Sequence, residues 1–307
     1  MKKFWQRPGV WILGCVCVAG LAVLAWPRTG PAEPASSQTA ESSVSSSASQ
    51  GAASQPEAPA DLLDGSFGFT NGAGDAFLVP RMGPELEAPE QLTRAVGENG
   101  VVLQLSYEGW QEGTAQDTGR FTADNFENIP GWRYTVTEGA PGSGKTYYAA
   151  PENALEPALL ETRPGDGQPL DETAAAELEA EKGRAIQNSW LLAGLGEENG
   201  FYLVLFEPEG EDLLASLVVS GPEGLLSKDY PAQLNGSSAW RVDDGGTMDP
   251  SLFQLVFAAE DDQCLALGVS WLGAEGESTV ILRQNGSALE EAGPSLPLYR
   301  HWMTAAK

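Results

Sequence analysis

The chain has 307 residues, with 17 Lys or Arg against 43 Asp or Glu, and a formal net charge of −26. Residues 1–28 hold four of the basic residues and no acid, so the chain from residue 29 onward carries a net charge of −30. A field of this sign repels nucleic acids and anionic lipid surfaces, which argues against nucleic-acid binding and favours cationic partners or simple solubility.

The N-terminal segment predicts a membrane anchor. The 17 residues Val10–Trp26 carry no charge, which is close to the shortest run, about 17 residues, that spans a bilayer as a helix. Three basic residues precede this run, and Arg28 follows it. Because basic residues stay on the cytoplasmic side, we expect residues 1–28 to be a signal-anchor in the cell membrane, with the rest of the chain outside the cytoplasm.

Two other interpretations of this segment stay open. Val23 and Ala25 form the small-residue pattern of a signal peptide cleaved after Ala25, which would leave a secreted protein. The stretch Ile12–Cys15 weakly resembles a lipoprotein signal, although Leu13 is bulky and the apolar run continues past the cysteine. All three interpretations export the remainder of the chain.

Residues 29–60 are rich in Ser, Ala, Pro and Gln and contain almost nothing to bury. Such a segment cannot offset the entropy of ordering and is expected to be a disordered tether. Residues 61–307 then form the exported domain, with a possible internal boundary near residues 163–170. This domain has the single cysteine Cys264, so an internal disulfide is excluded.

The first half of the domain predicts mostly strands. Residues 88–97 resemble a short helix, because Pro89 lies at the start and Gly97 follows the end. Residues 101–110, 131–138 and 145–151 are strand-like, with alternating or aromatic and β-branched side chains.

One long helix is predicted over residues 171–194. Asp171 is a suitable N-cap, and apolar residues recur at helical spacing through Ile186, Trp190 and Ala193. Gly183 would then lie inside the helix, at a cost of about 1 kcal/mol relative to Ala.

The remainder of the chain is strongly β. Residues 201–207 and 213–220 predict two strands, and residues 251–260, 263–272 and 278–284 predict a three-stranded antiparallel meander. The expected fold class is therefore α+β, mostly antiparallel sheet with one long helix.

The stretch from Gly139 to Thr146 matches the phosphate-binding pattern G-x-x-x-x-G-K-[ST] through Gly139, Gly144, Lys145 and Thr146. A phosphate loop needs a helix directly after it, but here two tyrosines and then Pro151 follow. We therefore interpret the stretch as a hairpin loop joining two antiparallel strands, and predict no nucleotide or other cofactor.

Two weaker sets of residues are candidates for chemistry. Cys264 and His301, the only cysteine and histidine of the domain, could form a catalytic thiol–imidazole pair. Asp243, Asp244 and Asp249 offer hard oxygen ligands to Ca²⁺, but they lack the spacing of an EF-hand, so a solvated turn is the better interpretation.

The favoured hypothesis is a membrane-tethered, extracytoplasmic and noncatalytic module that binds a protein or glycan partner at the cell surface. It follows from the anchor, the tether, the acidic domain and the lack of a clear catalytic pattern. The alternative is a cell-surface hydrolase acting on glycan or peptide. Six tryptophans in the domain would suit sugar binding if they are exposed beside acids, and core packing if they are buried.

Overall fold

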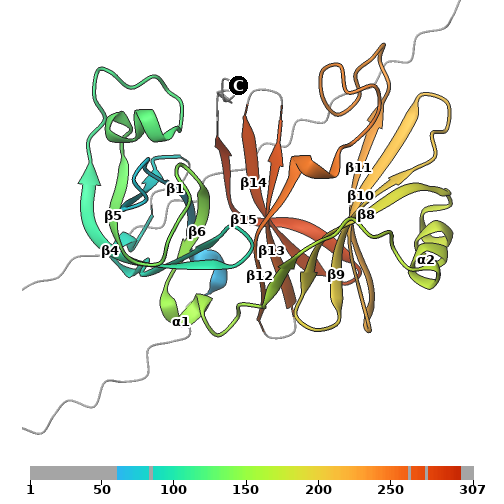
Figure 1. Cartoon of the computed structure of the whole chain (residues 1–307), viewed down its shortest axis with the longest axis horizontal. Coiled ribbons are helices and arrows are strands. Elements are labelled where there is room, and N and C mark those ends of the chain that lie inside the picture. The colour runs from blue at the N-terminus through green and yellow to red at the C-terminus, as the bar shows by residue number, and fades with distance from the viewer. Residues whose placement is uncertain (1–60, 83–85, 262–263, 274–275, 299–307) are drawn as a thin grey trace, which may run out of the picture. The chain divides into compact units, whose positions relative to one another are not determined.

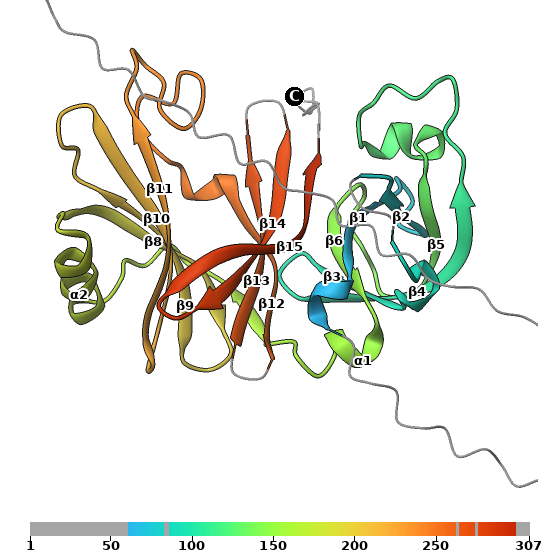
Figure 2. The ribbon, with the colours of Figure 1, turned by 180° about the vertical axis from the view of Figure 1, so that it is seen from behind.

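Antiparallel strands make up most of the regular structure (Figures 1 and 2). This computed structural model describes residues 61–82, 86–261, 264–273 and 276–298. The predicted β-rich character is confirmed. The predicted anchor and tether lie outside the described residues, among which no helix is long and apolar enough to cross a membrane.

Residues 66–150 form a closed barrel with the strand order β1-β2-β5-β4-β3-β6. Strands β3, β4 and β5 are consecutive antiparallel neighbours, and β6 returns beside β3, which makes a Greek key. Phe77, Tyr134 and Tyr147 are fully buried in the same core cluster of this barrel. The barrel strands are β1 (Ser66–Thr70), β2 (Ala76–Pro80), β3 (Arg94–Gly97), β4 (Val101–Gln111), β5 (Gly131–Glu138) and β6 (Thr146–Ala150).

The connection between β5 and β6 corrects one prediction. These two strands are not neighbours in the barrel, because β5 lies between β2 and β4 whereas β6 lies between β1 and β3. The stretch around Gly139 and Gly144 is therefore the crossover of the Greek key and not a hairpin loop. Local sequence shows that a loop exists, but only long-range pairing decides which strands it connects.

Residues 162–298 form a nine-stranded sheet with the order β12-β13-β14-β15-β11-β10-β9-β8-β7. It consists mainly of two four-stranded antiparallel meanders, β8 to β11 and β12 to β15, whose last strands lie parallel at Ser227 and Ala288. The meander predicted at residues 251–284 is confirmed and continues into β15. The strands are β7 (Thr162–Pro164), β8 (Ile186–Leu195), β9 (Asn199–Phe206), β10 (Asp212–Gly221), β11 (Gly224–Gln233), β12 (Phe253–Asp261), β13 (Cys264–Leu272), β14 (Glu277–Asn285) and β15 (Ala288–Leu298).

The segment that follows β6 joins the two edges of this sheet. The Leu160 N–H donates to the Ala258 carbonyl over 2.9 Å, and the Glu260 N–H donates to the Ala158 carbonyl over 2.7 Å, so residues 158–160 run along β12. Strand β7 then pairs with β8 at the opposite edge. Residues 158–164 therefore contact both edge strands, β12 and β8, and we call this segment with its two contacts the seam.

The two meanders share one core because the sheet curves back on itself. Leu203 and Leu217 of the first meander and Leu267 and Leu282 of the second are fully buried in the same cluster. The barrel and the sheet are in turn packed together, since Tyr148 of β6 stacks on Phe257 of β12 with ring centroids 5.1 Å apart. The change from barrel to sheet falls at residues 151–161, which contain the short helix α1 (Glu152–Leu155).

The predicted long helix is half as long as expected. Helix α2 (Glu172–Lys182) begins at the predicted N-cap Asp171, whose carboxylate accepts the Thr173 and Ala174 N–H groups. It ends at Gly183, which adopts a left-handed φ of +65° and caps the helix. Residues 186–195 form strand β8 instead.

The cause of this error is visible in the register of β8. Two bulges, between Ile186 and Asn188 and between Leu191 and Ala193, shift its inward and outward alternation. Trp190 and Ala193 therefore lie on the same face although they are three residues apart, whereas Ile186 packs on the opposite face beside α2. The apparent helical stripe thus combines residues from both faces of the strand. The pairing with β9 could not be read from this pattern.

The helix predicted at residues 88–97 is also wrong. The structure has only the 3₁₀ turn η2 (Pro89–Gln91) there, followed directly by strand β3. Arg94–Gly97 pairs with β4 on one side and β6 on the other, so barrel closure overrides the local helix signal. The remaining 3₁₀ turns are η1 (Leu62–Asp64), η3 (Ala123–Asn128) and η4 (Pro250–Leu252).

Candidate functional site

A cleft of about 300 Å³ opens where the barrel meets the seam of the sheet. Two turns of the barrel and strands β8, β12, β13 and β14 contribute to its walls. Its lining residues are Glu98, Asn99, Lys145, Thr146, Pro164, Gly165, Leu192, Phe253, Gln254, Leu255, Val256, Ser270 and Glu277. The volumes of small-molecule sites begin at about 300 Å³, and such sites occur preferentially where two substructures meet.

One wall of the cleft is a buried polar cluster on neighbouring strands. Ser270 of β13 lies opposite Thr279 of β14, and their hydroxyl oxygens are 2.7 Å apart. The Ser270 hydroxyl donates to Oε1 of Glu277 over 2.7 Å, and the Thr279 hydroxyl, 3.3 Å from the same oxygen, donates to Ser270. Glu277 is 6 % exposed, so the sheet holds a carboxylate in fixed orientation at the surface of the cleft.

The turn between β3 and β4 forms another part of the lining, and its Asn99 N–H donates to the Leu255 carbonyl of β12 over 3.2 Å. Glu98 and Asn99 have left-handed φ values of +47° and +60°, as a tight hairpin turn requires. The Glu98 carboxylate accepts the Gly142 N–H over 2.8 Å and also the hydroxyl of Tyr147. Burial and this carboxylate raise the pKa of Tyr147 above its ordinary value, so the phenol stays a donor.

The crossover loop is held rigidly against the barrel. The Thr70 hydroxyl donates to the Gly142 carbonyl over 2.6 Å and accepts the Lys145 N–H over 3.1 Å. The Gly144 N–H donates to the Asn71 carbonyl over 3.3 Å. Three N–H groups that a phosphate loop would offer to a nucleotide, those of residues 142, 144 and 145, thus donate inside the protein.

The loop nevertheless presents two of the residues singled out in the sequence to the cleft. Thr146 is buried at the start of β6, whereas the Lys145 side chain is exposed. No ion pair between described residues includes Lys145. The lysine therefore adds a positive charge to a cleft that also carries the carboxylates of Glu98 and Glu277.

Among the other sequence candidates that the structure describes, neither Cys264 nor the three aspartates line this cleft. Cys264 is half-buried as the first residue of β13, opposite Asp261. His301 lies outside the described residues, so the proposed thiol–imidazole pair stays a prediction.

The three aspartates proposed for Ca²⁺ organise the turn before β12. The Asp243 carboxylate accepts the Ser237 hydroxyl over 2.7 Å, and Asp249 caps the turn η4. Among the described residues, no three Asp, Glu, His or Cys side chains are grouped as metal ligands.

Asp244 has a distinct role in this turn. Its carboxylate accepts four backbone N–H groups, from residues 239, 240, 241 and 246, over 2.7–3.0 Å. Burial alone would raise the pKa of Asp244, but these N–H groups outweigh it and hold the pKa below its ordinary value. The carboxylate thus stabilises the loop from inside.

Aromatic side chains form a second surface on the barrel. A bulge in β4 between Tyr107 and Gly109, where Gly109 has a φ of +127°, places Tyr107 and Trp110 on the same face of the strand. Trp132 of β5 contacts both, with ring centroids 6.1 Å from Tyr107 and 4.9 Å from Trp110. The Arg81 guanidinium lies 6.0 Å from the Trp110 ring. We call these four residues the aromatic patch.

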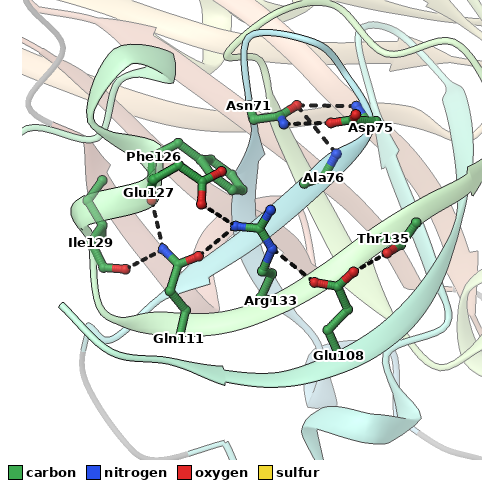
Figure 3. A network of polar contacts seen from close by, with 10 residues as sticks. All are labelled: Asn71, Asp75, Ala76, Glu108, Gln111, Phe126, Glu127, Ile129, Arg133 and Thr135. Carbon is green, nitrogen blue, oxygen red and sulfur yellow. Dashed lines mark hydrogen bonds and ion pairs between the residues drawn. The ribbon is translucent and has the colours of Figure 1, made fainter. Parts of the chain in front are cut away.

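The polar network beside this patch is structural (Figure 3). Arg133 donates to Glu108 over 2.9 Å and to Glu127 and Gln111 over 2.7 Å each, and it lies over the Phe126 ring. The Gln111 amide in turn donates to two backbone carbonyls of residues 126 and 129. These groups satisfy one another and fasten the long loop between β4 and β5 to the barrel.

Sequence reasoning missed the carboxylates of the cleft. Glu277 follows the acidic turn after β13, where acids are usually solvated. The available signal was the pair Ser270 and Thr279, which are polar side chains inside otherwise apolar strands. The chain matches no protein-family model, and no curated protein or solved structure is significantly similar to it.

Proposed function

We propose that this chain is a membrane-tethered, extracytoplasmic binding module, and that its ligand is a small polar molecule bound in the cleft. The observation that carries the proposal is the concentration of buried polar side chains there. Eight polar or charged residues are buried among the described ones, and Thr146, Ser270, Glu277 and Thr279 are four of them. Thr146, Ser270 and Glu277 line the cleft, and Thr279 lies directly beside Ser270.

Such a cluster is costly to the fold. Burying a carboxylate or a hydroxyl costs free energy unless hydrogen bonds compensate, and an apolar side chain of similar size would fill the same space more cheaply. A polar cluster lining a cleft is therefore better explained by recognition than by stability. The tether and anchor predicted from residues 1–60 would display this cleft outside the cell.

The binding proposal is tested with the full chain in detergent. A library of small polar metabolites is screened by thermal shift, and each hit is measured by calorimetry on the wild type, on Glu277→Gln and on Glu223→Gln. Glu223 is an exposed acid in the β10–β11 turn and serves as the matched control. We expect at least one ligand whose affinity falls in Glu277→Gln and not in Glu223→Gln. A library without any Glu277-dependent ligand would contradict the proposal.

The location is tested separately by cell fractionation. We expect the protein in the membrane pellet, resistant to high salt and released by detergent, because an apolar helix and not a charged surface would hold it. Mature protein in the medium that begins at Trp26 would establish the signal-peptide alternative instead.

The aromatic patch supports a second candidate ligand, a glycan. Tyr107 is 37 % exposed, and the β4 bulge places it on the same face as the half-buried Trp110, so their aromatic rings offer apolar surface to a sugar ring. Pull-down on insoluble polysaccharides, with Tyr107→Ala and with the control Val102→Ala, tests this idea. Equal retention of the two variants would remove it.

A further inference from the structure

We propose that Asn235 is a site of spontaneous chemical modification, at which the side-chain amide is lost through a cyclic imide and replaced by aspartate or isoaspartate. The chain contains five Asn-Gly sequences, which begin at residues 71, 99, 199, 235 and 285. A glycine after asparagine favours this reaction because glycine has no side chain to crowd the attacking backbone nitrogen. The folded structure decides which of these asparagines can react.

The reaction needs only water as a co-reactant. The backbone nitrogen of Gly236 attacks Cγ of Asn235, so that a bond from this nitrogen to Cγ forms while the bond from Cγ to Nδ2 breaks. Nδ2 leaves as ammonia and takes the proton of the glycine N–H with it. Water then opens the resulting imide ring at either of its C–N bonds. Opening at Cγ gives aspartate, and opening at the backbone carbonyl gives isoaspartate, in which the chain runs through Cγ.

In three of the five sequences, hydrogen bonds or strand pairing block this attack. The Asn71 carboxamide donates to the carboxylate four residues later over 2.6 Å and accepts three backbone N–H groups, so it cannot rotate (Figure 3). After Asn99, the Gly100 N–H donates to a carbonyl of the same turn over 3.0 Å. After Asn199, Gly200 lies within β9 and is paired with both β8 and β10, so its nitrogen is fixed in the sheet.

The other two sequences form a matched pair. Asn235 and Asn285 are both exposed, and each begins an Asn-Gly-Ser tripeptide. Each asparagine pairs with the residue three positions later, which makes a tight turn with the glycine at its second position. The glycines have similar φ values, +66° at Gly236 and +61° at Gly286. Neither glycine N–H donates to another described residue, so in both turns the attacking nitrogen is available.

The two turns differ in what holds the asparagine side chain. Nδ2 of Asn285 donates to the Glu290 carboxylate over 3.0 Å, and the Ser287 carbonyl of the same turn accepts a backbone N–H of β11 over 3.2 Å. The Asn235 carboxamide makes no hydrogen bond with a described residue. Its Cγ can therefore turn toward the Gly236 nitrogen at no cost in hydrogen bonds, whereas Asn285 must first break a bond to a charged group.

The modification changes the loop that Asp244 holds together. Asn235 exchanges two backbone hydrogen bonds with Ser238, over 2.8 and 3.2 Å, and the Ser237 hydroxyl between them donates to Asp243. Isoaspartate inserts a methylene into the backbone of this turn, and either product adds a negative charge to a loop that already contains two carboxylates. The reaction thus lengthens or charges the start of the loop and is not reversed by water.

The test incubates the full chain in detergent, in heavy-oxygen water at mildly alkaline pH, and follows each Asn-Gly peptide by mass spectrometry. Opening of the imide places a solvent oxygen in each product, and chromatography separates isoaspartate from aspartate. We expect the Asn235 peptide to convert first and into both products. It should convert roughly tenfold faster than the Asn285 peptide, which corresponds to about 1.4 kcal/mol in the barrier, close to the contribution of one hydrogen bond to a charged group.

Two variants and one condition identify the cause of this difference. Glu290→Ala should raise the rate at Asn285 toward that at Asn235, because it removes the acceptor that holds the amide. Glu223→Gln, at an exposed acid of the β10–β11 turn, should change neither rate. In concentrated urea, where both turns are open, the two peptides should convert at similar rates.

The proposal is overturned if another Asn-Gly peptide converts before that of Asn235, or if the Asn235 peptide does not convert at all. It is also overturned if Asn235 gives only aspartate, which is the product of direct hydrolysis of the side-chain amide. A difference between the two turns that persists in urea, or that Glu290→Ala leaves unchanged, would show that the side-chain hydrogen bond does not control the reaction.

Discussion

At the residue scale, single hydroxyls and carboxylates hold the parts of this fold together. Tyr148 is fully buried, and its hydroxyl donates to the Leu62 carbonyl over 2.6 Å and accepts the Gly65 N–H over 3.1 Å. It therefore connects the first turn of the domain to the last strand of the barrel. The Asp244 carboxylate likewise holds one loop together, by accepting four of its backbone N–H groups.

We expect Tyr148→Phe to lower the free energy of unfolding by about 1–3 kcal/mol, because it leaves a buried carbonyl and a buried N–H without their partner. Urea unfolding measures this change. Tyr107→Phe is the matched control, since Tyr107 is partly exposed and its hydroxyl makes no hydrogen bond with a described residue; it should stay within about 0.5 kcal/mol of wild type. Equal values for the two variants would contradict the assigned role.

Asp244 should make stability depend on pH. Its pKa in the folded state lies below the ordinary value of 3.8, so its contribution is present above that value and is lost as the pH falls through the lower, folded pKa. Asp244→Asn should therefore be less stable than wild type at pH 7, and the difference should shrink below about pH 4. Urea midpoints at several pH values measure it. A difference independent of pH would show that the charge of Asp244 is not what stabilises the loop.

At the element scale, Gly183 marks the point where the chain changes from helix α2 to strand β8. Gly183 ends α2 in the left-handed region, and the two bulges of β8 shift which of its apolar residues face each side of the sheet. The sequence located the start of α2 correctly, since N-capping is local. It could not locate the end, because the pairing of β8 with β9 depends on residues further along the chain.

The sign of the stability change in Gly183→Ala distinguishes whether Gly183 lies inside a helix or caps its end. In the interior of a helix, alanine would stabilise the protein by about 1 kcal/mol. At a φ of +65° alanine is strained, and we expect a loss of about 1 kcal/mol instead. No atom lies within 4 Å of the added Cβ, so strain alone decides the result. Urea unfolding measures it, with Ala175→Gly inside α2 as a control that should be destabilising.

At the scale of the whole described molecule, the barrel and the sheet share a core. Phe257 of β12 is fully buried and stacks on Tyr148 of β6. We expect Phe257→Ala to cost about 3–5 kcal/mol and to lower the stability of both substructures together. Hydrogen exchange in low urea should show the same loss in peptides from β2 and from β13. Val242→Ala, at a position 76 % exposed, should change neither. A loss confined to β13 would show that the two substructures unfold independently.

Local sequence patterns were enough to predict the β-rich character of the domain, about half of its strands, the C-terminal meander and the N-cap of α2. These features follow from side-chain period and turn chemistry, which act over a few residues. The export of the domain and the anchor stay predictions of the same kind.

The closure of the barrel, the Greek-key crossover and the seam that joins the edges of the sheet became visible only in the folded chain. Folding also brought Glu98, Lys145 and Glu277 to one cleft, although they come from distant parts of the chain. The physical reason is that strand pairing and burial are long-range: a local pattern can show that a residue is polar, but not which other polar residues lie across the space it faces.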